Sequence, residues 1–189
     1  LAQRRADHEV TIDEVLGSTM ISYPHTSMMA CAAGGGAAAA IVATREVAER
    51  LGSGRPLVFV TNAQQTSEIY TDGHVFLGAV IGPAQMTRDT AGDAYEQAGV
   101  GPDDLDLVQV HDAFPVEELV YYELLGICGD GEGDRLVAEG ATGLGGRIPF
   151  STDGGLTALG HPGGPTGLAQ IHEATLQLRH EAGVRQVDA

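Results

Sequence analysis

The sequence of 189 residues contains no lysine and no tryptophan, and its ten basic side chains are all arginine. Against them stand 26 acidic side chains, which give a formal net charge of −16. A surface of that sign repels phosphate backbones, so we expect neither nucleic acid nor an anionic membrane as a partner. An anionic small ligand needs local arginines or helix N-termini that override the overall field.

Cysteine is scarce, and long apolar runs are missing. Cys31 and Cys128 fit no zinc spacing and no CxxC redox motif, so we expect no metal site, while a disulfide stays open. No apolar run reaches the roughly 20 residues of a membrane-spanning helix, and no signal peptide is recognisable. A cytoplasmic protein is therefore the default expectation.

Apolar residues make up 43% of the chain, which indicates a globular protein with a core. Apolar spacing and following glycines predict helices at 45–51, 84–99, 116–125 and 168–182. In the last of these, one face carries a row of mainly apolar residues: Leu168, Ile171, Ala174, Thr175, Leu178 and Ala182.

Thr11 and Glu14 have the spacing of a capping box, which predicts a short helix after Thr11. Short apolar runs at 37–44, 57–60 and 105–110 predict buried strands. The step from a helix at 84–99 through a turn to a strand at 105–110 is typical of α/β folds.

A first chemical candidate follows the predicted strand 105–110, where the sequence reads His111-Asp112-Ala113-Phe114. Ligands and catalytic groups gather at the carboxyl ends of strands in α/β sheets. A histidine there can polarise a carbonyl or hold a catalytic water. The residues alone favour the plainer alternative, a turn histidine satisfied by Asp112 or by the backbone.

A second candidate is Gly160-His161-Pro162, which precedes further glycines and a predicted helix. Glycines allow a ligand to approach the backbone closely. A histidine in such a loop can take a proton from a thiol or an alcohol. The alternative is a glycine-rich connector. Asp153-Gly154-Gly155 is more typical of a structural turn than of a ligand tunnel, and Cys31 and Cys128 are more typical of packing than of a nucleophile.

Taken together and in order, these motifs resemble the thiolase superfamily, in its sterol-carrier or lipid-transfer type. The resemblance covers 103–187 most strongly and is carried by His111-Asp112-Ala113-Phe114, Glu123 to Cys128, Gly145 to Pro149, Gly154-Gly155-Leu156, Gly160-His161-Pro162 and the tail Gln177 to Val187. It implies a layered α/β/α fold with a mixed sheet flanked by helices. It also implies two parts: the end of an N-terminal thiolase-like half at 1–54, and an incomplete C-terminal domain at 55–189.

The resemblance further implies that His161 activates a nucleophilic cysteine and that His111 helps to form an oxyanion hole. Asp112, Phe114, Gly155 and Pro162 are the expected substrate-binding residues. The implied reaction is acyl transfer on a 3-oxoacyl-CoA or on a sterol- or lipid-derived CoA thioester. Coenzyme A is then a substrate or a product, and no other cofactor is expected.

In this family the nucleophile belongs to the N-terminal half, and neither cysteine of this sequence matches its position. We therefore expect the chain to be a portion of a longer enzyme that forms a homodimer. Two departures, Ser151-Thr152-Asp153 for Asn-Pro-Ser and Gly163-Gly164-Pro165 for Leu-Gly-Ala, indicate a divergent branch.

Two alternatives stay open. The first is a steroid side-chain retro-aldol lyase that works with a small OB-fold partner, although that branch carries Tyr-Asp where this sequence has His111-Asp112. The second is a non-catalytic thiolase-like subunit.

Overall fold

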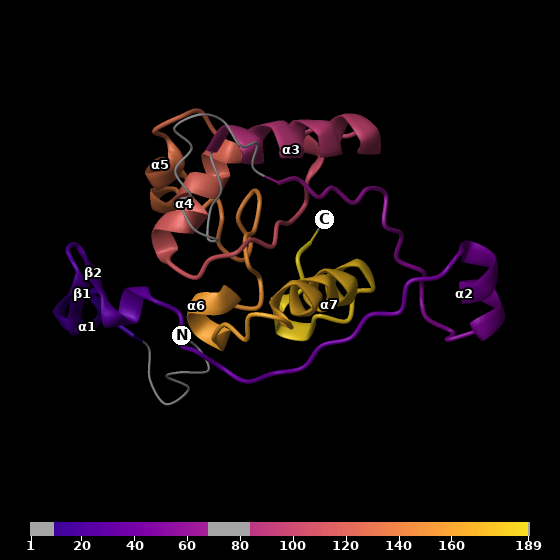
Figure 1. The fold of residues 1–189 in the computed structure, drawn as a ribbon, viewed down its shortest axis with the longest axis horizontal. Coiled ribbons are helices and arrows are strands. Elements are labelled where there is room, and N and C mark those ends of the chain that lie inside the picture. The colour runs from indigo at the N-terminus through magenta and orange to yellow at the C-terminus, as the bar shows by residue number, and fades with distance from the viewer. Residues whose placement is uncertain (1–9, 68–83, 189) are drawn as a thin grey trace.

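The computed structural model describes residues 10–67 and 84–188 (Figure 1). Its helices are α1 (Ile12–Gly17), α2 (Arg45–Leu51), α3 (Ala84–Ala98), α4 (Pro115–Leu124), α5 (Gly133–Ala138), α6 (Gly155–Leu159) and α7 (Thr166–Leu178). Strands β1 (Met20–Ser22) and β2 (His25–Thr26) pair, and 3-10 turns span Ser27–Met29, Pro102–Asp104 and Gly183–Arg185. Parts of both predicted domains, at 1–9, 68–83 and 189, lie outside the described residues, and the boundary after residue 54 stays a prediction.

The predicted helices are confirmed where a terminating residue follows them. Helix α2 ends at Gly52 and α3 ends before Gly99, and both glycines adopt the left-handed conformation that closes a helix. Helix α4 begins at Pro115, whose fixed φ suits a first helical position. The capping box is also confirmed, since Thr11 and Glu14 exchange side chain-to-backbone hydrogen bonds at the start of α1.

Two predicted strands are wrong. Residues 37–44 and 57–60 are extended but join no sheet, and the sheet of the described residues consists of β1 and β2, paired antiparallel. Ile41 and Val42, expected to be buried, are 90% and 82% exposed. A strand needs a neighbour for its backbone groups, and neither run meets one in the described part of the chain.

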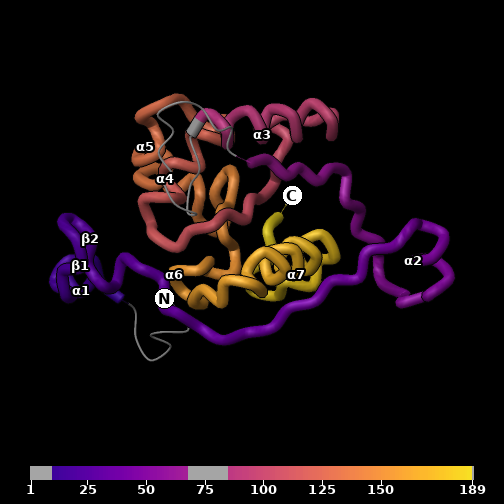
Figure 2. Tube along the Cα trace, viewed as in Figure 1, coloured from indigo at the N-terminus to yellow at the C-terminus, as the bar shows by residue number. Residues whose placement is uncertain are grey.

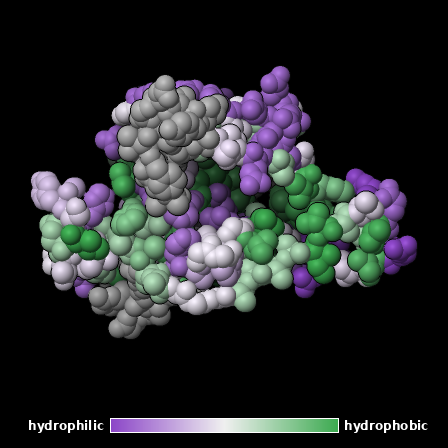
Figure 3. Space-filling model, viewed as in Figure 1, coloured by the Kyte–Doolittle hydropathy of each residue, from purple (hydrophilic) through white to green (hydrophobic). Residues whose placement is uncertain are grey.

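The exposed runs border an apolar cleft of about 640 Å³ beside α2. Its lining includes Ile41, Val42, Leu51 and Phe59, with Arg179 at its edge. Figure 3 shows apolar surface gathered on this side of the molecule. The tube in Figure 2 shows the long extended path by which the chain reaches α2 after the first elements.

The predicted strand at 105–110 is reduced to one parallel bridge between Val108 and Phe150. The Val108 amide donates to the Pro149 carbonyl, and the Ser151 amide donates to the Val108 carbonyl. This short pairing fixes where the chain leaves toward His111, so the position of the first candidate is set by backbone contacts.

The core lies between α4, α5 and this paired segment. It consists of Val110, Tyr122, Ile127, Leu136, Ile148 and Phe150. The Tyr122 ring packs edge-on against Phe150, with centroids 4.6 Å apart. Its hydroxyl donates to the Glu118 carboxylate and also contacts the Thr142 hydroxyl oxygen at 3.1 Å. The phenol therefore joins the core to a polar network, and the Thr142 contact holds α4 near its C-terminal end.

Helix α7 is confirmed but ends at Leu178, four residues before the predicted end, and its apolar row largely faces outward. Leu168, Ile171 and Leu178 are exposed, the last by 61%, whereas Glu173 and Gln177 are buried. The Glu173 carboxylate accepts hydrogen bonds from Arg185 and from the Thr152 hydroxyl, which draws the polar side of the helix inward.

Within residues 10–67 and 84–188, no helix is long and apolar enough to cross a bilayer. The same residues contain no cluster of three or more His, Cys, Asp or Glu side chains placed to bind a metal ion.

Candidate functional site

The two histidines predicted from their motifs, 50 residues apart in the sequence, meet in the structure. The Nε2 atoms of His111 and His161 are 3.4 Å apart, and the rings meet edge to face at a centroid distance of 4.8 Å. His111 lies between the Val108 bridge and α4, and His161 lies between α6 and α7. The His161 amide also donates to the Ala32 carbonyl at 2.8 Å.

Each ring has a second partner on its far side. The Nδ1 atom of His111 lies 3.1 Å from a carboxylate oxygen of Glu117, whose side chain is 4% exposed. The Nδ1 atom of His161 lies 2.8 Å from the Thr166 hydroxyl. The site is thus a row of four hydrogen-bonded side chains, Glu117–His111–His161–Thr166, in which the outer two are buried and the histidines are half-buried.

Glu117 is the acidic side chain among the four residues of the candidate site. Burial raises the pKa of the Glu117 carboxyl above its ordinary value, and the adjacent His111 ring and backbone amides of Phe114 and Ala113 act in the opposite direction. A buried carboxylate of this kind keeps its charge only beside a cation or hydrogen-bond donors.

Asp112, an expected substrate-binding residue, is buried, and its carboxylate is hydrogen-bonded to backbone amides of the protein. It accepts hydrogen bonds from the amides of Leu156 at 2.8 Å and Thr157 at 3.4 Å, at the start of α6. Gly155 packs directly against it, because a Cβ atom at Gly155 would lie 2.1 Å from an Asp112 oxygen. These contacts support a role for both residues in fixing α6 beside the histidines; their role in substrate binding stays a prediction.

Phe114 and Pro162, the other two expected substrate-binding residues, flank the pair. Phe114 is the residue before α4, and its ring lies edge-on to His25 with centroids 6.1 Å apart. Pro162 follows His161 and packs close to Gly36, where an added Cβ atom would come within 3.1 Å of the proline ring. Both stay predictions as substrate contacts.

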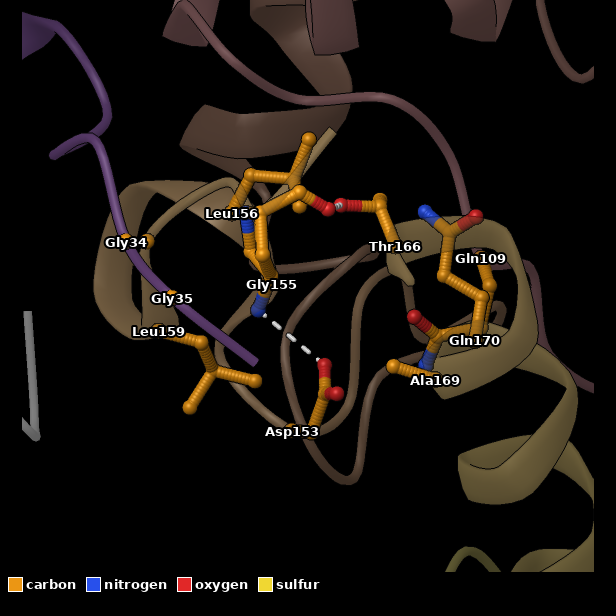
Figure 4. A pocket seen from close by; sticks show the side chains of 12 residues that line it. Gly34, Gly35, Gln109, Asp153, Gly155, Leu156, Leu159, Thr166, Ala169 and Gln170 are labelled. Atoms are coloured by element: carbon orange, nitrogen blue, oxygen red, sulfur yellow. Dashed lines mark hydrogen bonds between the residues drawn. The ribbon is translucent and has the colours of Figure 1, made fainter. Parts of the chain in front are cut away.

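A cavity of about 120 Å³ lies behind the His161 loop (Figure 4). Figure 4 shows Gln109 and Gln170 on one side of it and Leu159 on the other, with Asp153 hydrogen-bonded to the Gly155 amide. Burial raises the pKa of the Asp153 carboxyl. The side-chain oxygen of Gln109 is buried without a hydrogen-bond partner, while its amide nitrogen donates to the Thr152 hydroxyl.

The two cysteines form no disulfide, and both are half-buried. Burial and the nearby carboxylates Glu123 and Glu132 raise the pKa of the Cys128 thiol, which disfavours the reactive thiolate. The Cys31 amide donates to the Ala113 carbonyl and so ties its segment to the residue after Asp112.

Comparison with known proteins decides the family. Residues 80–189, more than half of the chain, match the family described as thiolase C-terminal domain-like. The chain belongs to this family. The thiolase superfamily suggested by the motifs is therefore confirmed.

Thiolase relatives cover almost the whole chain. It is 34% identical over 180 residues to the benzoylsuccinyl-CoA thiolase subunit BbsB of Thauera aromatica, covering 95% of this chain and 46% of that protein. It is 37% identical to sterol carrier protein 2 of Rattus norvegicus, covering 95% and 33%. It is 36% identical to an acetyl-CoA acetyltransferase of Methanothermobacter thermautotrophicus, covering 95% and 46%. The chain thus spans less than half the length of these relatives.

A solved structure of the Ltp2–ChsH2(DUF35) aldolase matches with a TM-score of 0.72 over 94% of this chain and 45% of that one. At 23% identity this likeness concerns the fold, and it confirms the partial thiolase-like α/β class.

Two side chains of the candidate site were not singled out from the sequence, namely Glu117 and Thr166. Both lie in the first turn of a helix that directly follows one of the histidine motifs. An acidic residue there is usually explained by the helix dipole, and a threonine by capping. The available signal was position: Glu117 is the third residue of α4 and Thr166 the first of α7, so both lie close to the loop before their helix.

Proposed function

We propose that this protein takes part in acyl transfer on CoA thioesters, either a 3-oxoacyl-CoA or a sterol- or lipid-derived thioester. The observation that carries the proposal is the 3.4 Å contact between the Nε2 atoms of His111 and His161. Acyl transfer needs a base for the attacking thiol and a donor for the oxyanion, and two adjacent imidazoles can supply both.

In this proposal His161 takes the proton of the nucleophilic thiol, and His111 donates a hydrogen bond to the thioester oxygen as negative charge develops on it. With a 3-oxoacyl-CoA, the thiolate sulfur bonds to the 3-oxo carbon and the bond between C2 and C3 breaks. The electron pair of that bond passes to the CoA thioester as an enolate, and His161 returns its proton to C2. The acyl group then passes from the enzyme sulfur to the thiol of free CoA, whose proton returns to the cysteine. The nucleophile is proposed to be a cysteine other than Cys31 and Cys128.

The test is turnover of a 3-oxoacyl-CoA with free CoA by the purified gene product. We expect His161→Ala to lower kcat by about 100-fold or more, the usual range for losing a general base. His172→Ala is the matched control, because His172 is exposed on α7 and outside the pair. Unchanged CoA-dependent turnover in His161→Ala would refute the proposal.

The alternative activity is retro-aldol cleavage of a sterol-type CoA thioester, and the same preparation distinguishes it. That reaction needs no free CoA as acceptor and survives a thiol alkylator, whereas acyl transfer through a cysteine is abolished by it. No turnover under either condition would favour a non-catalytic thiolase-like subunit.

We also propose a cytoplasmic homodimer with a small partner protein of the OB-fold type. Support comes from the motif resemblance and from the aldolase structure, in which Ltp2 is combined with ChsH2(DUF35). Light scattering of the purified gene product, alone and with the product of a neighbouring gene, measures both states. A monomer that binds no such protein would contradict this assembly.

A further inference from the structure

The hydrogen bonds around His161 fix its tautomer. Thr166 has a single hydroxyl hydrogen, and its oxygen lies 2.9 Å from the Pro162 carbonyl, which can only accept. The hydroxyl hydrogen therefore points to Pro162, and the Thr166 oxygen accepts from Nδ1–H of His161 at 2.8 Å. With its proton on Nδ1, a neutral His161 presents an unprotonated Nε2 to His111.

The hydrogen bond of His111 on its other side has the same consequence. An ionised Glu117 can only accept, so Nδ1 of His111 carries the proton in the 3.1 Å contact with that carboxylate. A neutral His111 then also presents an unprotonated Nε2. Two lone pairs 3.4 Å apart form no hydrogen bond, whereas one added proton between them makes an N–H···N bond.

The two outer partners are unequal, and this decides where the added proton resides. His111 contacts a carboxylate that is almost fully buried, and His161 contacts a neutral hydroxyl. We propose that Glu117 is a positioning residue that makes His111 the proton-carrying ring of the pair and leaves Nε2 of His161 as the free base. The charges of Glu117 and protonated His111 then cancel, which lowers the penalty of burying the carboxylate.

The other ionisable groups around the pair are engaged elsewhere. Asp112 is bonded to the amides at the start of α6, and Glu118 accepts the hydrogen bond of Tyr122. Tyr121, next to Glu117 on α4, has a pKa raised by burial and by that carboxylate, so it stays neutral. The His25 ring packs edge-on against Phe114, and Asp153 lines the cavity and accepts a hydrogen bond from the Gly155 amide. Within residues 10–67 and 84–188, Glu117 is therefore the anion in contact with the pair.

The catalytic consequence of this inference rests on the proposed function. Without substrate, the proton on Nε2 of His111 is shared with Nε2 of His161 in the N–H···N bond. When the thioester oxygen accepts this hydrogen bond instead, Nε2 of His161 is released to take the thiol proton. Glu117 thus assigns different roles to two identical side chains, a donor on one side of the reacting carbonyl and a base on the other.

The protonation site can be measured without substrate, so it is tested independently of the proposed function. In protein carrying 15N-labelled histidine, the nitrogen shifts report the protonation of each ring atom as the pH is lowered. The two rings are assigned with His111→Asn and His161→Asn variants. We expect the first proton taken up by the pair to appear on Nε2 of His111, while Nε2 of His161 stays unprotonated. If the first proton taken up by the unmodified protein appeared on Nε2 of His161, the inference would be overturned.

The matched variants are Glu117→Gln and Glu123→Gln. Both remove a carboxylate from α4, but Glu123 accepts from the Gly133 amide and does not contact the histidines. We expect Glu117→Gln to remove the preference for His111 and to lower kcat about tenfold, the size of one charge-assisted hydrogen bond. Glu123→Gln should leave both unchanged. Equal nitrogen chemical shifts in Glu117→Gln and in the unmodified protein would refute the assignment. If the nitrogen shifts differ between the two proteins but the unmodified protein shows no turnover, the assignment stands and only the proposed reaction is refuted.

Discussion

Replacing Gly155 with alanine should be among the most damaging single-methyl changes in this chain. Gly155 has φ +62°, and a Cβ atom there would lie 2.1 Å from an Asp112 oxygen. The left-handed conformation costs a residue with a Cβ atom about 1 kcal/mol. Displacing the carboxylate from the Leu156 amide forfeits a charged hydrogen bond of about 1.5–3 kcal/mol. Together the two effects predict a loss of about 3 kcal/mol.

Gly183→Ala separates the two effects. Gly183 has φ +64°, nearly the same conformation, but an added Cβ atom would have no neighbour within 4 Å. Urea unfolding followed by far-UV circular dichroism gives the free energy of unfolding of each variant. We expect a loss of about 1 kcal/mol in Gly183→Ala and about 3 kcal/mol in Gly155→Ala. Equal losses would show that Asp112 moves aside freely and would refute its role in fixing α6.

Two further predictions concern buried polar groups. Tyr122→Phe should lower the free energy of unfolding by about 1–3 kcal/mol, because it leaves the half-buried Glu118 carboxylate without its donor; an unchanged urea midpoint would contradict this. Burial raises the pKa of Glu173, but hydrogen bonds from Arg185 and from its other partners, Thr152 and Gln177, outweigh that and lower it below its ordinary value of 4.5. The ionised Glu173 carboxylate therefore contributes its full stabilisation at pH values above 4.5, and this stabilisation is lost as the pH falls below 4.5. Glu173→Gln should make the urea midpoint less dependent on pH below about pH 4.5, and equal slopes in both proteins would refute the pairing.

The helices could be predicted because nearby residues determine where each of them begins and ends. Gly52, Gly99 and Pro115 act through the backbone of their own turn, and no distant partner is needed. The runs at 37–44 and 57–60 are different. Their apolar, β-branched residues fit a strand, but a strand forms only where another segment supplies hydrogen-bond partners. Nothing in a local pattern reports whether such a segment is there.

The two histidines of the candidate site could be picked out from the sequence, whereas their contact and their other partners could not. His111 and His161 stand in motifs that carry the family resemblance. Their 3.4 Å contact depends on two parallel bridges between distant segments, Val108 with Phe150 and Ala33 with His161. The role of Glu117 depends on its burial, and a glutamate in the first turn of a helix is usually exposed. Geometry of this kind becomes visible only after the chain is folded.

Helix α7 has a consequence for the solution behaviour of the described structure. Its polar residues Glu173 and Gln177 are engaged inside, so the side that meets water carries Leu168, Ile171 and Leu178. Such an exposed apolar surface favours non-specific association. The electrostatic repulsion that opposes this association comes from the net charge of −16 carried by the whole sequence. Salt shortens the reach of that repulsion to about 10 Å at 0.1 M and about 3 Å at 1 M. Colloidal stability of this chain is therefore electrostatic in origin and declines as ionic strength rises.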